Sequence, residues 1–202
     1  MAITNGYATL AHIRDYLGVP STDNANTANL ERAVAGASRK IDKYCGRTFS
    51  DTGSASAKTF RANDPFELDV PDFHTVTGFL VETDTTNDGT FDTTWASSDY
   101  QVEPLDPEDG WPWWWVTAVD TKTFPTGSRR ARVQITARWG WEAVPTDVEI
   151  VCLELAGELF KRKDSPYGIA GFNDFGPVRV SASDMRLLVN LHDFQRVVVG
   201  AV

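Results

Sequence analysis

The strongest constraint on the fold is that helix-type and strand-type patterns occupy different parts of the chain. Apolar residues recur at helical spacing near both ends of the sequence, over about residues 9–17, 27–44, 146–159 and 183–196. The middle has no helical period and consists of short β-type runs separated by turn signals. The order helices, strands, helices predicts an α+β fold: a small helical bundle formed by the N- and C-terminal helices, with an inserted antiparallel β lobe.

The predicted helices carry recognisable end signals. Thr9 can cap the first helix, and Gly18 and Gly46 follow the first two helices where a left-handed C-cap is typical. Thr146 and Glu149 have the spacing of a capping box at the start of the third helix. Because these helices are amphipathic, each needs a partner surface, and we expect them to pack together.

The β lobe is predicted from a series of strand-type runs. Residues 130–138 alternate apolar and polar side chains, as is typical of a strand with one face in water. The run Asn87-Asp88-Gly89 is a hairpin signal between two of the predicted strands. The predicted strands are Lys58–Arg61, Phe66–Val70, Val76–Glu82, Thr90–Trp95, Tyr100–Glu103, Trp113–Val119 and Arg130–Arg138.

Charge divides the chain in a similar way. The net charge is −9, but residues 51–128 contain three Lys and Arg against fifteen Asp and Glu, a balance of −12. We therefore predict two parts: residues 1–50 and 139–202 as a helical core, and residues 51–138 as an inserted acidic, Trp-rich β lobe. The lobe's charge argues against nucleic-acid binding through it, although the same charge also fits a plain solvated surface.

Composition excludes several classes of protein. A chain of 202 residues, 42% of them hydrophobic, can bury a core without a stabilising metal or disulfide. No run approaches the ~20 apolar residues of a membrane helix, and the N-terminus lacks a basic region followed by an apolar run. We therefore expect no membrane association, no signal peptide and folding in a cytoplasm. Cys45 and Cys152 each fall in a predicted helix, and we interpret them as buried thiols.

Motifs for catalysis or cofactor binding are absent from the sequence. His12, His74 and His192 share no metal-ligand spacing, and the sequence has no nucleophile elbow, phosphate-binding loop or H-E-x-x-H motif. We therefore predict a protein that is not an enzyme and that has no cofactor and no metal. A hydrolase that uses a carboxylate pair, for example among Asp106, Glu108 and Asp109, is a third and weaker hypothesis.

One loop resembles a calcium-binding loop in part. Asp84, Asp88, Gly89 and Asp92 occupy ligand or turn positions of such a loop, but its twelfth position is Trp95 where a bidentate Glu is required. A hairpin explains the same residues, and we favour that interpretation.

Four of the seven tryptophans lie in one segment, Trp111-Pro112-Trp113-Trp114-Trp115. On a strand, Trp113 and Trp115 share one face and Trp114 lies on the other. In a lobe made of a single sheet, both faces cannot easily be core, so we expect one ring to be exposed in a contact. The alternative is that large rings fill the core of a small lobe.

Three stretches, taken in order, carry a resemblance to a known family. The first comprises Tyr7-Ala8-Thr9-Leu10, Leu30-Glu31-Arg32-Ala33 and Ser38-Arg39-Lys40-Ile41-Asp42-Lys43-Tyr44-Cys45-Gly46-Arg47. The second is Arg138-Trp139-Gly140-Trp141 followed by Val144-Pro145, and the third is Ser165-Pro166-Tyr167-Gly168. In these stretches, which cover both helical ends but not the acidic lobe, the chain resembles the head–tail connector (adaptor) proteins of tailed bacteriophages.

The resemblance implies a structural virion protein located at the head–tail interface and assembled in the host cytoplasm. Such a head-to-tail adaptor forms a homo-oligomeric ring, here expected to be a dodecamer, under the portal protein. The ring extends the DNA channel and docks a downstream stopper or tail-completion protein. DNA would pass through the lumen without specific binding, and an acidic lobe facing the channel would let it slide.

Two sets of residues are candidate contacts. The C-terminal segment of such proteins commonly contacts the portal, which implies a portal contact by Leu191, Phe194, Val197, Val198, Val199 and Val202. A contact with a neighbouring subunit or a tail-side component is the hypothesis for Trp111, Trp113, Trp114 and Trp115. The alternative function is a carbohydrate- or host-surface-binding module that uses the same tryptophans.

Overall fold

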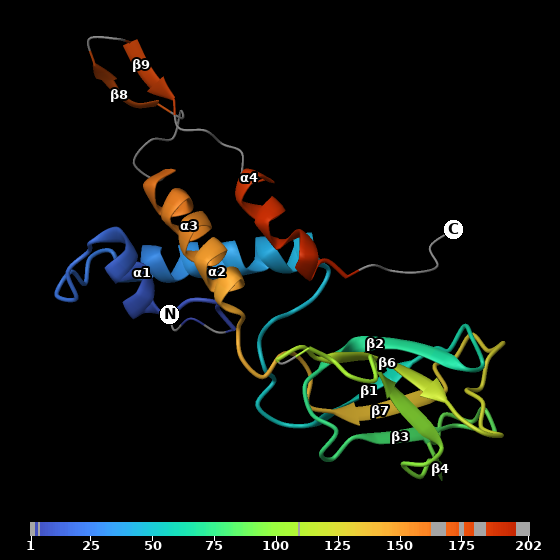
Figure 1. The fold of residues 1–202 in the computed structure, drawn as a ribbon. Coiled ribbons are helices and arrows are strands. Elements are labelled where there is room, and N and C mark those ends of the chain that lie inside the picture. The colour runs from blue at the N-terminus through green and yellow to red at the C-terminus, as the bar shows by residue number, and fades with distance from the viewer. Residues whose placement is uncertain are drawn as a thin grey trace. The chain divides into compact units, whose positions relative to one another are not determined.

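The computed structural model describes residues 3, 5–108, 110–162 and 185–196, and the backbone of 169–173 and 176–179. The chain divides into two compact units (Figure 1). The helical unit comprises Met1–Phe49 and Val144–Val202, and the sheet unit comprises Ser50–Ala143. Helices and antiparallel sheets occupy separate units, which confirms the predicted α+β fold class.

The helical unit is built around two long helices that pack against each other. Its principal helices are α1 (Leu10–Leu17), α2 (Thr27–Cys45) and α3 (Thr146–Arg162), and α1 contacts both of the others. Thr9 accepts the His12 N–H at 3.1 Å, and Gly18 and Gly46 take left-handed conformations as C-caps. The predicted ends of the first two helices are therefore confirmed, because they depend only on local geometry.

Two helix predictions differ from the structure. Thr146 is the first residue of α3 rather than its cap, and the Glu149 carboxylate contacts the ring Nδ1 of His12. The last helix is shorter than residues 183–196 and consists of α4 (Met185–Leu188) and the 3₁₀-helix η1 (Val189–Phe194). Short 3₁₀ turns are frequent at the ends of α-helices.

A small hairpin lies between α3 and α4 in the sequence. It consists of β8 (Ile169–Asn173) and β9 (Gly176–Arg179), which pair antiparallel. The other residues between α3 and α4 lie outside the described part of the chain.

The sheet unit contains two antiparallel sheets. The first has the strand order β1-β7-β3-β4, and the second has the order β2-β6-β5. The strands are β1 (Ser56–Phe60), β2 (Glu67–Phe73), β3 (Leu80–Thr83), β4 (Thr93–Thr94), β5 (Tyr100–Glu103), β6 (Trp113–Ala118) and β7 (Val133–Ala137). Each predicted run overlaps a strand, but the premise of a single sheet is wrong.

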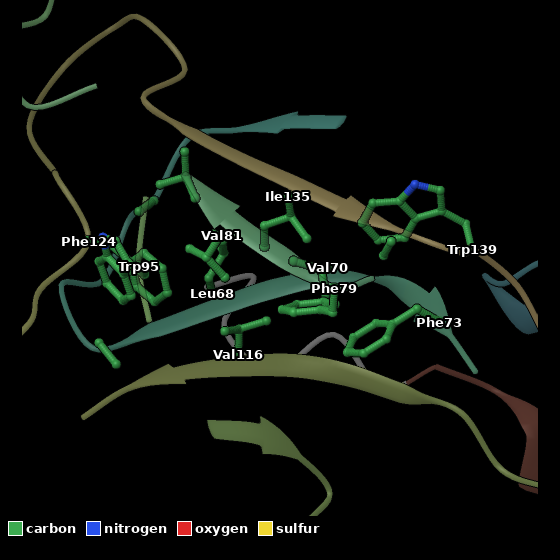
Figure 2. Packing of buried hydrophobic residues seen from close by; sticks show 14 residues of the cluster. Leu68, Val70, Phe73, Phe79, Val81, Trp95, Val116, Phe124, Ile135 and Trp139 are labelled. Carbon is green, nitrogen blue, oxygen red and sulfur yellow. The ribbon is translucent and has the colours of Figure 1, made fainter. Parts of the chain in front are cut away.

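One hydrophobic core joins the two sheets (Figure 2). Leu68 and Val116 enter it from the second sheet, and Val81 and Ile135 enter it from the first. The alternation of β7 buries every second side chain, as the sequence pattern predicts. Aromatic rings fill the ends of this core: Phe73 stacks on Phe79 at 4.7 Å, and Trp95 stacks on Phe124 at 4.8 Å.

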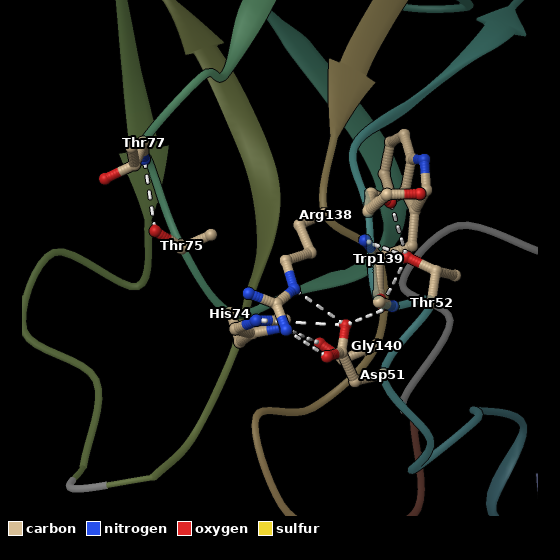
Figure 3. A network of polar contacts seen from close by, with 10 residues as sticks. Asp51, Thr52, His74, Thr75, Thr77, Arg138, Trp139 and Gly140 are labelled. Atoms are coloured by element: carbon tan, nitrogen blue, oxygen red, sulfur yellow. Dashed lines mark hydrogen bonds and ion pairs between the residues drawn. The ribbon is translucent and has the colours of Figure 1, made fainter.

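The two ends of the sheet unit are bonded to each other through an insertion clamp, residues 50–52 and 138–141 (Figure 3). The Thr52 N–H donates to the Trp139 carbonyl at 3.0 Å, and the Trp139 N–H donates to Thr52 Oγ1 at 3.1 Å. The Trp139 ring is buried in the core, and its indole N–H donates to the Ser56 carbonyl at 2.8 Å. We predicted that residues 139–143 belong with the helices, whereas the structure includes them in the sheet unit.

A charged pair lies beside these bonds. Arg138 donates from Nε to the Asp51 carboxylate at 3.0 Å and from Nη2 to the second carboxylate oxygen, so the pair is bidentate. The hydrogen bond from Arg138 lowers the pKa of Asp51 below its ordinary value. Because the pair is close to solvent, it orients the two segments more than it stabilises them.

Within the insertion clamp, Gly140 lies very close to the backbone of Ser50. Its N–H donates to the Asp72 carbonyl at 2.6 Å, and its φ of 94° is one that other residues rarely adopt. An added Cβ would overlap the Ser50 carbonyl oxygen, which belongs to backbone that is itself held in the clamp. Glycine is therefore required here for both conformation and space.

In the helical unit, the buried side chain of Tyr7 bonds two segments together. Its hydroxyl donates to the Asp42 carboxylate and accepts the Phe49 N–H at 3.0 Å. The Tyr7 ring also packs edge-on against the Phe49 ring at 5.6 Å. Burial raises the pKa of Tyr7, so its hydroxyl keeps the proton that it donates to Asp42; burial also raises the pKa of Asp42.

We predict that Gly140→Ala destabilises the protein by at least ~2 kcal/mol, because strained φ and steric overlap add together. The measurement is the free energy of unfolding in urea. The matched control is Gly53→Ala, where φ is also positive (75°) but nothing lies near the added Cβ. Equal losses for the two variants would show that the close approach to Ser50 contributes nothing.

Tyr7→Phe is predicted to cost about 1–3 kcal/mol, because it leaves the Phe49 N–H and the half-buried Asp42 carboxylate without this partner. The raised pKa of Asp42 means that the folded chain binds this proton more readily than the unfolded chain. Stability therefore falls as pH rises above the ordinary aspartate pKa, and losing the hydroxyl enlarges this fall.

The loss in Tyr7→Phe should therefore be larger at neutral pH than near the ordinary pKa of aspartate, as measured by urea unfolding at both pH values. Tyr16→Phe is the control, because the Tyr16 side chain is 53% exposed. A loss in Tyr7→Phe that does not change with pH would contradict the assigned role of Asp42.

Candidate interaction surfaces

The four clustered tryptophans are all half-buried rather than divided between core and solvent. Trp113 stacks on the core ring of Phe73 at 5.9 Å, and Trp111 lies 5.1 Å from the buried Trp141. Two of the rings thus help to close the sheet unit. Trp113 and Phe73 are direct partners in the register of β6 and β2, so their rings stack within the second sheet.

The pairing of β6 with β2 is irregular next to Trp113, where four positions along β2 lie opposite two along β6. The register between β2 and β6 shifts between Asp69 and Phe73. Such irregularities re-aim side chains along a strand. Trp115 lies between Asp69 on β2 and Glu103 on β5 in the pairing register, so acidic residues flank it on both sides.

Trp111 and Trp114 line a pocket of about 280 Å³ that also has two carboxylates. We call it the acidic–aromatic pocket; its lining residues are Pro104, Asp106, Pro107, Glu108, Trp111 and Trp114. The Trp111 N–H donates to the Glu108 carbonyl at 2.8 Å and so closes the loop. Leu105 is in this loop and is 70% exposed.

A second depression, of about 360 Å³, lies between α2 and α3. We call it the basic groove; small and apolar residues (Ala33, Gly36, Leu159, Phe160) and two cations (Arg32, Lys40) line it. Arg32 is exposed, and its guanidinium reaches the Asn29 side chain at 3.4 Å. The sequence places both cations on the outer face of one helix, but it gives no sign of the groove, because distant α3 forms the other wall.

The C-terminal segment lies against the end of α2. Leu191 is fully buried, and the Phe194 ring packs edge-on against Phe49 at 5.8 Å. The Arg196 N–H donates to the Cys45 carbonyl at 2.8 Å. Leu191 is therefore a core residue of the helical unit, since the apolar stripe of its helix faces that core. The other candidate portal contacts, Val197, Val198, Val199 and Val202, lie outside the described residues.

In the loop that resembles a calcium-binding loop, the first acidic residue, Asp84, is bonded to backbone N–H groups of the loop itself. The buried Asp84 carboxylate accepts the N–H groups of Asn87 at 2.5 Å, Asp88 at 3.2 Å and Gly89 at 2.8 Å. Burial acts to raise the pKa of Asp84, but these N–H groups outweigh it and the pKa is lowered. Because β3 and β4 pair on either side, the hairpin interpretation is confirmed.

The two cysteines are the remaining side chains that could suggest reactivity. Cys45 and Cys152 are free and buried, and burial raises the pKa of each thiol to about 11. Both thiols are therefore protonated and unreactive at neutral pH. Among the described residues, no group of His, Cys, Asp and Glu side chains is placed to hold a metal ion. No described helix has the length and apolar character needed to cross a membrane.

Comparison with solved structures finds chains of similar fold in phage-like particles. One is from the neck of an empty GTA particle computed with C6 symmetry, with a TM-score of 0.61 and 20% identity. Another is from the neck of a native GTA particle computed with C12 symmetry (0.55, 19%), and a third is from the virion of a native gene transfer agent particle (0.54, 20%). Each alignment covers 99% of this chain and 96% of the other. Neither a family model nor a curated protein matches the sequence. At this identity, the similarity establishes a shared fold.

Proposed function

We propose that this chain is a structural subunit of the neck of a phage-like particle and acts there as a head-to-tail adaptor. The observation that carries the proposal is the full-length similarity of fold to chains of GTA necks and virions, which includes both units. The resemblance of the helical ends to connector proteins supports it independently. This role is non-enzymatic and requires no cofactor.

In this role the chain forms a ring under the portal protein, and the ring extends the DNA channel and docks the next tail-side protein. The C6 and C12 symmetries of the similar neck structures support a ring of identical copies. The acidic balance of residues 51–128 supports a lumen along which DNA passes without specific binding, since phosphate contacts need Lys and Arg. The protein would be located in the virion after assembly in the host cytoplasm.

The portal contact is assigned to the apolar segment after Arg196, together with Phe194. Leu191 has a different part in this proposal: it anchors the segment by being buried in the helical unit. An uncharged stretch such as Val197–Val202 gains most by docking on another apolar surface. The tryptophan segment remains the candidate for contacts with a neighbouring subunit or a tail-side protein.

The test is binding to the portal protein of the same particle. We expect the purified chain to form a ring on the portal, seen as a complex by size-exclusion chromatography and electron microscopy. Deleting the residues after Arg196, or introducing Val198→Asp with Val199→Asp, should abolish the complex, because the apolar contact is lost. Circular dichroism should be unchanged in both variants.

The matched control is Met185→Ser, which alters an apolar side chain that is 59% exposed but lies before the tail. This variant should bind the portal normally. A full-length chain that binds neither the portal nor any other virion component would overturn the proposed function.

A further inference from the structure

The acidic–aromatic pocket has the chemistry of a site for a cationic side chain. The faces of its two indole rings attract cations, and Arg stacks on Trp more favourably than on other rings. Asp106 and Glu108 add carboxylates that can accept hydrogen bonds from a guanidinium or ammonium group.

The basic groove has the opposite chemistry. Its floor is apolar, and Arg32 and Lys40 lie on the same helix eight positions apart, on the side that lines the groove. No carboxylate is among its described lining residues. A suitable occupant is therefore an exposed apolar side chain with acidic neighbours. The apolar stretch Val197–Val202 does not meet this requirement, since none of its side chains is acidic.

The loop of the acidic–aromatic pocket meets this requirement. Leu105 is the most exposed large apolar side chain among the described residues, and Asp106 follows it directly. The two surfaces belong to different units of the chain, so one copy can offer its pocket while the next offers its groove. Complementary charge of this kind favours encounter and fixes register between partners.

We infer that the acidic–aromatic pocket of one copy binds the basic groove of the next copy. Leu105 enters the groove over Gly36 and Leu159, and Arg32 or Lys40 reaches the carboxylates and indole faces of the pocket. The contact joins two different surfaces, so it repeats from copy to copy and gives a ring when the rotation closes. The expectation that the copies close into a ring rests on the proposed function, whereas the contact between two copies does not depend on it.

The test uses two charge-reversed variants of the full chain. One carries Arg32→Glu with Lys40→Glu, and the other carries Asp106→Lys with Glu108→Lys. We expect self-association of the wild-type chain by analytical ultracentrifugation over a concentration series, weakened by salt. Each variant alone should associate at least about tenfold more weakly, because like charges then face each other. An equimolar mixture should regain association, since each altered surface meets its complement on the other variant.

The matched control for the first variant is Lys43→Glu with Arg186→Glu, which changes the net charge by the same amount at exposed positions outside the groove. This control should associate as the wild type does. A position-specific check mixes Leu105→Cys with Arg32→Cys chains under mild oxidation and looks for a disulfide between copies. Cys45 and Cys152 are buried, so the introduced thiols are the reactive ones. Leu105→Cys mixed with Lys43→Cys should not form this bond.

Three results would overturn the inference: a wild-type chain that stays monomeric throughout the series, variants that associate like the wild type, or a mixture that does not regain association. None of these outcomes bears on portal binding through the C-terminal segment. Conversely, a chain that associates as described but ignores the portal would overturn the proposed function and leave this contact in place.

Discussion

The hydrogen bonds between Thr52 and Trp139 are the constraint on which the architecture depends. They join the two ends of the sheet unit, so a long insertion leaves and returns to the helical part of the chain at one place. Holding these ends together offsets the entropy that a free loop of this length would lose on closure. As a consequence, α2 and α3 can pack as neighbours although the whole sheet unit separates them in sequence.

Several of the residues that carry the sequence resemblance form hydrogen bonds between segments that are far apart in the sequence. Tyr7 bonds to Asp42 and Phe49 in the helical unit, and Trp139 and Gly140 belong to the insertion clamp. Such positions accept few residue types, because a hydrogen-bond direction, a buried volume or a positive φ must be met at once. This explains how a resemblance can rest on the ends of the chain while the acidic lobe takes no part in it.

The chain's surface chemistry suits assembly more than turnover. The buried Asp84 carboxylate is bonded to its own loop, and the Cys45 and Cys152 thiols are protonated at neutral pH. The exposed features are instead an apolar leucine, half-buried indoles and cations beside an apolar floor. These are the residue types that carry energy and specificity at protein interfaces.

The sequence by itself determined the fold class, the order of elements and the ends at Gly18 and Gly46, because spacing and backbone conformation are local properties. It also indicated that Asp84 belongs to a hairpin, since Trp95 cannot replace a ligand. Only the tertiary structure decided that the lobe has two sheets, that Leu191 is core and that α3 completes a groove beside Arg32. Periodicity specifies which face of a segment is apolar, but the surface that covers this face comes from residues far along the chain.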